Sequence, residues 1–283
     1  MKNKKIAVLT DSSCEIDELT ANKLGLYVLR MPIEINDVEY KESVDLSLDD
    51  LKAKLKEGYF AKTSQPKMGD IIDMYEKLLK EYDAIVYIPL AQNLSGTYQT
   101  ASMIASNYDN RIAVVDAEYA CYPVTKLCLE AKELIKRGYD DIFEIKRIIE
   151  ERCELYAMII PNDINYLKLG GRITPAAASL ANVLKIVPIL SLKNGIIDLY
   201  DKVRTEKKAI QKAIVPVTDV ENYADYYWMI IHDDRPEEAL ALKKQLMEIT
   251  GQEVTIESFG AVILSHTGPG TLAFGRLRKV IRD

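Results

Sequence analysis

The chain has 283 residues, of which 48% are hydrophobic and 28% are charged, a composition typical of a soluble globular protein with a sizeable core and one or two domains. Its net charge of -6 and pI of about 5.3 argue against nucleic acid as a partner. No apolar run in the sequence approaches the length of a membrane span.

The four cysteines contain no closely spaced pair and are accompanied by only two histidines, so we expect no metal site. Reduced thiols in a cytoplasmic protein are the simpler interpretation. The chain starts with a basic segment, but the apolar stretch after it ends at Asp11. That stretch is too short for a signal peptide and predicts a first strand instead.

Strand-like and helical patterns alternate through the first half of the chain. We expect strands over 5–11, 84–90 and 112–116, an extended segment over 26–35 followed by a hairpin turn at 36–37, and helices over 15–24, 48–55, 69–80, 98–107, 124–136 and 142–151. Residues 60–66 interrupt the pattern as a loop, because Pro66 forces Gln65 into an extended conformation. This succession predicts a Rossmann-like α/β domain with a parallel sheet and right-handed crossovers.

The second half of the chain has a different character. We expect strands over 156–160, 186–191, 195–203, 228–232, 253–258 and 261–264, helices over 175–184, 206–214 and 236–249, and a last loop over 266–271. The Asn194-Gly195 step predicts a hairpin turn. We therefore expect an N-terminal α/β domain over 1–155 and a mixed α+β domain over 156–283. No low-complexity linker separates them, which favours close packing.

Four short polar segments are candidates for a binding site. They are Thr63-Ser64-Gln65-Pro66, Asn93-Leu94-Ser95-Gly96-Thr97-Tyr98, Gly170-Gly171-Arg172 and His266-Thr267-Gly268-Pro269-Gly270-Thr271. The second follows an apolar strand and precedes a helix, so its backbone N–H groups and the hydroxyls of Ser95 and Thr97 favour an anion. The alternative for the first two segments is that their hydroxyls only cap helices. Gly-Pro-Gly is most often a simple turn.

Taken together, these segments supply hydroxyls, backbone amides, one His and one Arg, with no acidic partner among them. Such a set suits a carboxylate or phosphate ligand better than it suits hydrolysis. The sequence contains no G-x-G-x-x-G and no P-loop, so a dinucleotide or nucleoside triphosphate site lacks its usual signature.

The combination of these motifs, in this order, resembles the DegV family of bacterial fatty-acid-binding proteins. The resembling residues run from one end of the chain to the other: Asp11-Ser12-Ser13, Thr63-Ser64-Gln65-Pro66, Leu94-Ser95-Gly96-Thr97-Tyr98, Val115-Asp116, Leu169-Gly170-Gly171-Arg172-Ile173, Lys202-Val203-Arg204-Thr205 and His266-Thr267-Gly268-Pro269-Gly270-Thr271. The motifs are short singly and specific together. One departure is Lys67, which stands where the family often has a small hydroxyl residue.

The resemblance implies a long-chain fatty acid in an apolar tunnel between the two domains, with no cofactor, no metal and no catalytic residue. It implies that Thr63 and Ser95 hold the carboxylate and that Arg172 and His266 lie near it. The supporting positions are Ser64, Gln65, Gly96, Thr97 and Gly268. Members of the FakB type present the fatty acid to a separate ATP-dependent fatty acid kinase subunit, and the acyl phosphate enters phospholipid synthesis. A transient contact with a membrane is left open.

Other functions also remain open at this point. One is a serine hydrolase acting on a lipid ester, with Ser95 as nucleophile and His266 as base, although no G-x-S-x-G surrounds Ser95. Others are a kinase in its own right, without a Walker-type loop, and a lipid-sensing regulatory module. Aliphatic residues of the second half are candidates either for the tunnel wall or for ordinary core: Leu180, Val183, Leu184, Val187, Ile189 and Leu192.

Overall fold

The N-terminal lobe is built on a four-stranded parallel sheet of order β2-β1-β6-β7 in the computed structural model, which describes residues 4–282. Its strands are β1 (Ile6–Asp11), β2 (Tyr27–Leu29), β6 (Ala84–Ile88) and β7 (Ile112–Val114). Strands β1, β6 and β7 are buried along their whole length, as expected for a parallel sheet with helices on both faces.

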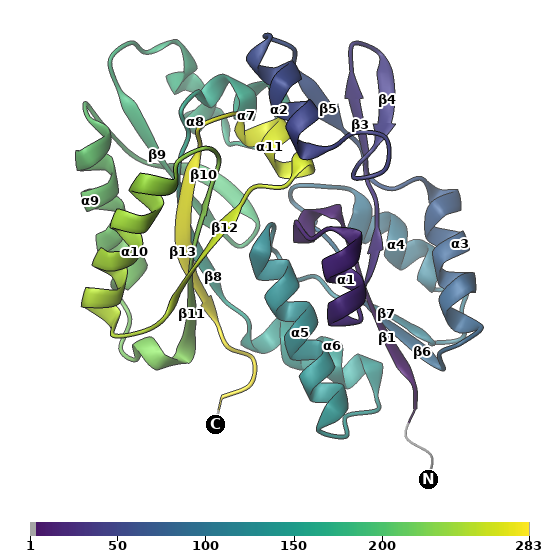
Figure 1. Cartoon of the computed structure of the whole chain (residues 1–283). Helices are drawn as coiled ribbons and strands as arrows, with labels where there is room; N and C mark the ends of the chain where they lie inside the picture. Colours follow the sequence, from purple (N-terminus) through teal and green to yellow (C-terminus); the bar gives the residue numbers. More distant parts are fainter. Residues whose placement is uncertain (1–3, 283) are drawn as a thin grey trace.

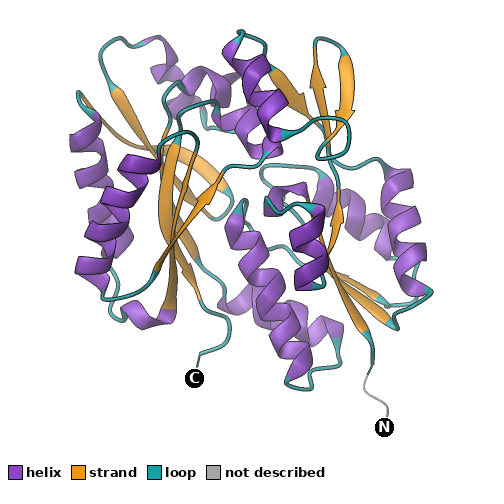
Figure 2. Cartoon of the chain, viewed as in Figure 1, coloured by secondary structure: helices purple, strands orange, loops and turns teal. Residues whose placement is uncertain are grey.

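Helices cover both faces of this sheet (Figures 1 and 2). They are α3 (Met68–Leu79) and α4 (Thr97–Ala105) on one face, and α1 (Glu18–Leu24), α5 (Tyr122–Lys136) and α6 (Ile142–Arg152) on the other. Alternate strand residues divide between the two layers: Leu9 packs with the helices α3 and α4, whereas Val8 packs with α5 and α6. The predicted parallel α/β architecture is therefore confirmed.

A small antiparallel sheet of order β4-β3-β5 lies beside helix α2 (Leu48–Lys56) at the top of the view in Figure 1. Its strands are β3 (Pro32–Ile35), β4 (Val38–Lys41) and β5 (Ala61–Thr63). The predicted hairpin is confirmed, and its turn places Asn36 and Asp37 at φ values of 52° and 61°. These left-handed values are tolerated best by Asn, Asp and Gly.

Two predictions in this region are wrong. The extended segment over 26–35 is two strands in two different sheets, β2 and β3, which are separated by Arg30 and Met31, and the Met31 backbone N–H donates to Ser12 Oγ at 2.8 Å. Residues 61–63, predicted as loop, form β5 and pair with β3. A three-residue strand before a proline carries too few alternating positions to give a pattern in the sequence.

The C-terminal lobe is built on a six-stranded mixed sheet of order β10-β9-β8-β13-β11-β12. All neighbouring strands are antiparallel except β11 and β12. The strands are β8 (Leu155–Ile160), β9 (Val187–Lys193), β10 (Ile196–Val203), β11 (Tyr226–His232), β12 (Val254–Ser258) and β13 (Leu272–Arg278). This mixed second half agrees with the predicted fold class.

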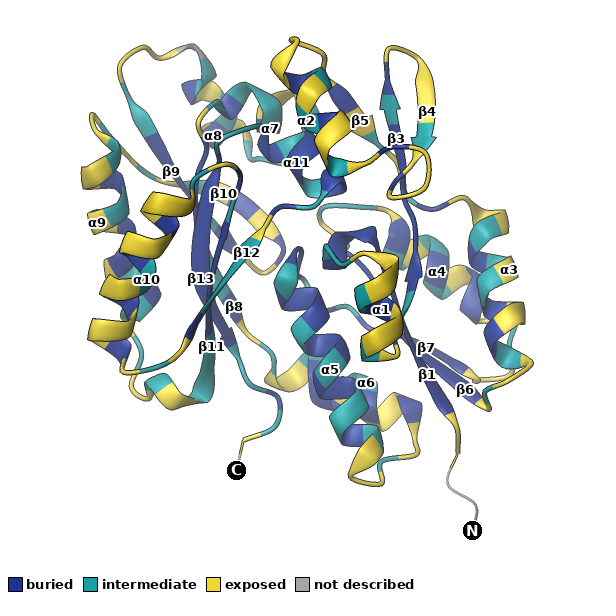
Figure 3. Cartoon of the chain, in the orientation of Figure 1, coloured by how far each residue is buried: buried dark blue, intermediate teal, exposed yellow. Residues whose placement is uncertain are grey.

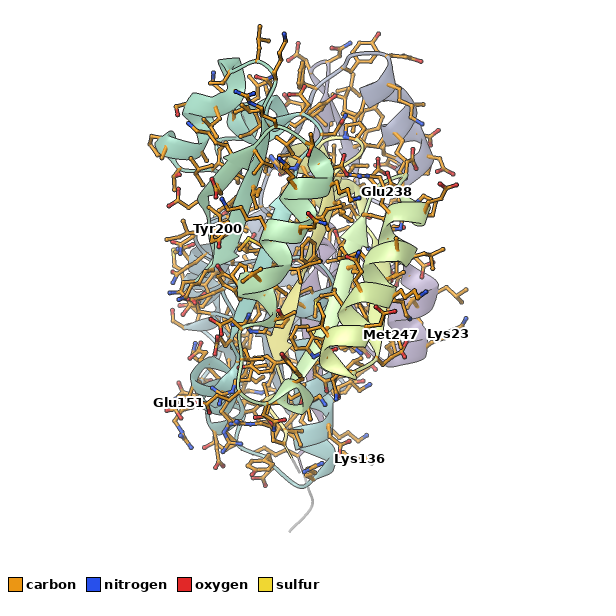
Figure 4. The ribbon with its side chains drawn as sticks, turned by 90° about the vertical axis from the view of Figure 1, so that its left-hand side faces the viewer. Lys23, Lys136, Glu151, Tyr200, Glu238 and Met247 are labelled. Atoms are coloured by element: carbon orange, nitrogen blue, oxygen red, sulfur yellow. The ribbon has the colours of Figure 1, made fainter. Side chains whose placement is uncertain are left out.

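The outer face of this sheet is covered by α9 (Glu206–Thr218) and α10 (Pro236–Thr250). Figure 4 looks onto these helices, where the labelled Glu238 and Met247 of α10 lie on the exposed side. The inner face of the sheet is turned toward the N-terminal lobe, and Figure 3 shows that the central strands are buried. The sheet is thus covered by helices on one side and by the other lobe on the second.

Short helices lie in the region where the two lobes meet. They are α7 (Ile164–Gly170), α8 (Pro175–Ala178) with a following 3-10 turn (Ser179–Asn182), and α11 (Ala261–Thr267). Helix α11 packs against α7 of its own lobe and against β5 and α2 of the N-terminal lobe. It therefore spans the contact between the two lobes.

Several predictions for the second half are wrong in detail. Residues 261–264, predicted as a strand, begin α11, which also contains the first residues of the predicted loop 266–271. A short apolar run that is buried on most sides does not distinguish helix from strand by its pattern. Helix α7 and strand β13 are not foreseen, and the helix predicted over 175–184 is a single turn followed by the 3-10 turn.

Candidate functional site

A mostly apolar cavity lies between the inner face of the second sheet and the N-terminal lobe. About 90 Å³ of it can hold the centre of a water-sized sphere, and about 900 Å³ is free of protein atoms when the open solvent at its mouth is counted. The sheet contributes alternate residues of three neighbouring strands, which are Leu155, Ala157 and Ile159 of β8, Met229 and Ile231 of β11, and Ala273 and Gly275 of β13. Alternate residues share one face of a strand, so these side chains form a continuous apolar floor.

The N-terminal lobe and α11 supply the other walls. The lining residues there are Met31, Leu90, Leu94, Ala120, Cys121 and Pro123 from the N-terminal lobe, and Val262 and Ile263 from α11. The polar residues of the wall are Thr63, Ser64, Ser95, Arg172, His266 and Thr267. All four residues predicted to hold a carboxylate therefore line one cavity.

Thr63 reaches the cavity from the end of β5. It pairs with Ile33 of β3, and the Ser64 backbone N–H donates to Pro32 O at 3.2 Å. The capping alternative for this segment does not apply, because the N-cap of α3 is Lys67 and no side chain caps that helix. The hydroxyl of Thr63 instead lies 2.6 Å from His266 Nε2.

Ser95 reaches the cavity from the loop between β6 and α4. Its Oγ lies 2.9 Å from Thr97 Oγ1 and accepts a longer bond of 3.3 Å from the Thr97 backbone N–H. The N-cap of α4 is Gly96, which has no side chain, so neither hydroxyl acts as the cap at that position. Thr97 is fully buried, whereas Ser95 lines the cavity.

Gln65 joins the two hydroxyl-bearing loops. Its Nε2 donates to Thr100 Oγ1 of α4 at 3.0 Å. The same side chain passes so close to Gly96 that a Cβ at that position would lie 2.5 Å from Gln65 Oε1. The absence of a side chain at Gly96 therefore leaves room for the end of the Gln65 side chain where the two loops meet.

His266 lies on the last turn of α11 rather than in a loop. Burial, and to a lesser degree the positive charge of Arg172, lowers the pKa of His266 to about 4. The imidazole is thus neutral near pH 7. Its Nδ1 is buried, has no hydrogen-bond partner among the described residues, and lies against Gly170, where a Cβ would be only 2.4 Å away.

Arg172 supplies the positive charge of the site. Its Nε donates to Leu94 O at 3.2 Å, and its Nη1 donates to Gly170 O. Burial lowers the pKa of Arg172, but an arginine remains charged at neutral pH. The guanidinium therefore joins the loop that carries Ser95 to the end of α7.

The turn after α11 depends on Gly268. This residue has a φ of 75°, and a Cβ there would lie 2.4 Å from the ring of Tyr166. The Tyr166 ring in turn packs against Phe60 of the N-terminal lobe, with a distance of 5.1 Å between the ring centroids. Gly268 thus allows the backbone to approach an aromatic ring closely.

The pairing that a serine hydrolase needs is not formed. His266 contacts Thr63, and Ser95 contacts Thr97, so the candidate nucleophile and the candidate base have different partners. Asp11, the last residue of β1, accepts bonds from the backbone N–H groups of Ser13 and Leu90, each at 2.9 Å. It fixes the ends of β1 and β6 and does not line the cavity.

The six aliphatic candidates for wall or core divide between several environments. Leu192 lines the cavity, whereas Leu180 and Ile189 are buried in the core and Val187 packs against it. Val183 and Leu184 are 46% and 85% exposed, so they are neither wall nor core. The floor residues of β8, β11 and β13 were missed, although the alternation of Ala273 and Gly275 with larger residues in β13 is a signal that could have found these two.

Nowhere among the described residues 4–282 do three or more His, Cys, Asp or Glu side chains gather in a way that could hold a metal ion. No helix in that part of the chain is both long and apolar enough to cross a membrane.

Comparison with known proteins identifies a family to which the chain is similar over most of its length. Residues 5–279 match the model described as "Uncharacterised protein, DegV family". Protein DegV of Bacillus subtilis is 31% identical over 272 residues, which cover 94% of this chain and 97% of that protein. A DegV domain-containing protein of Streptococcus pneumoniae is 31% identical over 277 residues, which cover 96% and 98%.

Solved structures agree with this match. The crystal structure of a fatty acid binding DegV family protein from Streptococcus agalactiae has a TM-score of 0.86 at 32% identity and covers 98% of this chain and 99% of its own. That of DegV, a fatty acid binding protein from Bacillus subtilis, has a TM-score of 0.83 at 31% identity with the same coverage. Family model, sequence and architecture coincide over nearly the whole length, and this chain is a member of the DegV family.

Proposed function

We propose that this protein binds a long-chain fatty acid in the cavity between its lobes, with the carboxylate at Thr63, Ser95, Arg172 and His266. The observation that carries the proposal is the uneven distribution of polarity in the cavity wall. Hydroxyls, a neutral imidazole and one cation line the cavity together with an extended apolar floor. The two relatives of known structure described above are fatty acid binding proteins.

In this proposal the apolar floor supplies most of the free energy of binding the hydrocarbon chain. Burying a methylene group is worth about 0.8 kcal/mol, so a chain of some fourteen methylenes gains on the order of 11 kcal/mol before the costs of association. The floor residues of β8, β11 and β13 are all apolar. The ligand class is therefore one with a long hydrocarbon chain.

The polar residues bind the carboxylate end of the proposed fatty acid. A carboxylate buried without partners is very costly, so its oxygens need donors and a compensating charge. Because the His266 ring is neutral, a proton on Nε2 can be donated to Thr63 Oγ1, which leaves the Thr63 hydroxyl hydrogen for the carboxylate. Ser95 offers a second hydroxyl donor, and Arg172 offers the positive charge.

We further propose that the protein presents this carboxylate to a separate ATP-dependent kinase subunit. The sequence has no nucleotide-binding loop of the usual kinds, whereas the proposed site holds an acid through hydroxyl donors that leave an oxygen free to accept a phosphoryl group. Incubation of the purified protein with a fatty acid kinase subunit and ATP, with acyl phosphate trapped by hydroxylamine, tests this step. Acyl hydroxamate should form only when both proteins are present.

The central test is what the purified protein carries. Protein expressed in a bacterial host should yield long-chain fatty acid on organic extraction and mass spectrometry, in a molar ratio approaching one. Delipidated protein should rebind fatty acid in a titration. Protein that carries none and binds none after delipidation would refute the proposal, and labelling of Ser95 by an active-site serine probe would favour a hydrolase.

A further inference from the structure

Helix α11 is the element on which the proposed carboxylate site depends most. It has only seven residues, yet Val262, Ile263, His266 and Thr267 all line the cavity. A helix of this length is not stable by itself, so contacts at its ends must fix its position. The turn that follows it is therefore a place where distant residues can control His266.

Asp233 fixes that turn. It follows the last residue of β11, is only 1% exposed, and its Oδ2 accepts a bond of 3.1 Å from the Gly270 backbone N–H. Its own backbone N–H donates to Thr271 O at 3.0 Å. One residue thus holds the turn by its main chain and by its side chain.

Lys52 of α2 completes the arrangement from the other lobe. Its Nζ lies 2.6 Å from Asp233 Oδ1 and also donates to Asp234 Oδ1 at 3.0 Å, and its side chain is only 17% exposed. A buried carboxylate that loses its partner is strongly destabilised, so the pair is sensitive to change at either residue. The neighbouring pair of Lys56 and Asp234 has an N–O distance of 3.3 Å, but its side chains are 64% and 51% exposed.

The turn is connected to His266 through short contacts. The Thr271 hydroxyl donates to Thr267 O at 2.8 Å, and the Gly268 backbone N–H donates to Leu264 O at 2.9 Å. Both bonds tie the turn to the last residues of α11. A shift of the turn therefore moves the residue adjacent to His266, whose ring Nε2 lies 2.6 Å from Thr63 Oγ1.

We propose that Asp233, paired with Lys52, is a positioning residue of the carboxylate site. It fixes the turn after α11 and so holds the His266 ring against Thr63, which orients the Thr63 hydroxyl toward the ligand. The inference rests on the proposed function in so far as the ligand is a carboxylate. The positioning of the ring itself is a property of the unliganded protein.

The test compares three variants with the parent. Asp233→Asn keeps an acceptor for the Gly270 N–H but removes the charge, and Lys52→Met removes the partner cation while keeping an aliphatic chain. Lys56→Met is the matched control, since Lys56 pairs with the exposed Asp234. The readouts are the dissociation constant for oleic acid and the ring nitrogen NMR signals of His266 in unliganded protein. The chain has two histidines, so His232→Gln assigns the signals.

Asp233→Asn and Lys52→Met should each shift the His266 ring signals and weaken oleic acid binding by about tenfold. Removing a residue that orients a ligand-binding side chain has an effect of this size at metal sites. Lys56→Met should match the parent in both readouts, and Lys52→Arg should restore most of the affinity.

Unchanged His266 signals in folded Asp233→Asn and Lys52→Met would overturn the proposal, even if binding weakened, because the pair would then have only a structural role. Failure of both variants to fold would count against it for the same reason. The proposed function fails separately, if the parent protein does not bind oleic acid while the His266 signals still respond.

Discussion

The floor of the cavity and its polar residues are constructed differently. The floor takes alternate residues from β8, β11 and β13, which are adjacent strands of one sheet. The polar residues come from the end of β5, the loop before α4, the segment after α7 and the last turn of α11. A sheet face tolerates changes of similar volume, whereas four side chains from separate elements depend on individual hydrogen bonds. Substitutions in the two regions should therefore have different effects.

The largest effect is expected from removing both hydroxyls. Thr63→Val combined with Ser95→Ala should weaken fatty acid binding at least 100-fold, because a hydrogen bond to a charged group contributes about 1.5–3 kcal/mol. Ser106→Ala, which removes a hydroxyl bonded to Met103 O at the other end of α4, is the control. Titration with a fluorescent fatty acid measures both. Binding within threefold of the parent would show that the carboxylate lies elsewhere.

The next effect concerns pH. The pKa of His266 is lowered from 6.5 to about 4, so the unfolded chain takes up the proton first as the pH falls. The contribution of His266 to the free energy of unfolding is therefore complete above the pKa of the unfolded chain and decreases as the pH falls from 6.5 toward 4. The expected decrease from pH 7 to pH 4.5 is about 2–3 kcal/mol. In urea denaturation, the free energy of unfolding of the parent should show this pH dependence, and that of His266→Gln should lack it. An NMR titration midpoint near 6.5 in the folded protein would contradict the burial of the ring.

A change in the floor should alter which ligands bind. Ala273→Leu adds three carbon atoms to the wall between Ile159 of β8 and Ile231 of β11. Affinity for the longest chains should fall by about 2 kcal/mol, since each displaced methylene costs about 0.8 kcal/mol, whereas chains shorter by about three methylenes should bind as before. Ala53→Leu, on the exposed side of α2, is the control. Equal losses for all chain lengths would indicate a general distortion instead.

The smallest effect is expected outside the cavity. Leu184 is 85% exposed, so Leu184→Ser should change the free energy of unfolding by less than about 0.5 kcal/mol and leave binding within twofold. Leu192→Ser, in the cavity wall, should weaken binding clearly. Equal effects of the two substitutions would remove the distinction between wall and surface. Calorimetry and ligand titration of both variants give the comparison.

The sequence predicts regular elements better than it predicts the site. Long periodic segments such as α5, α10 and the hairpin of β9 and β10 agree with their patterns, because many residues repeat one period. Short elements do not, and β5 and α11 each carry a site residue. The four polar residues were named through motifs, but the contact between Thr63 and His266 depends on tertiary packing over 203 residues of sequence separation.

The cavity floor has a consequence for the independence of the two halves. Ala157, Ile159, Met229 and Ile231 face the cavity and the N-terminal lobe, and on this side their own lobe contributes the short helices α7 and α11, whereas the long helices α9 and α10 cover the opposite face. A fragment beginning near residue 155 would expose this sheet face to water as one contiguous apolar surface. Such a surface promotes self-association, so the fragment should precipitate or form oligomers where the full chain does not. The N-terminal lobe thus protects its neighbour from self-association by keeping this sheet face out of contact with water.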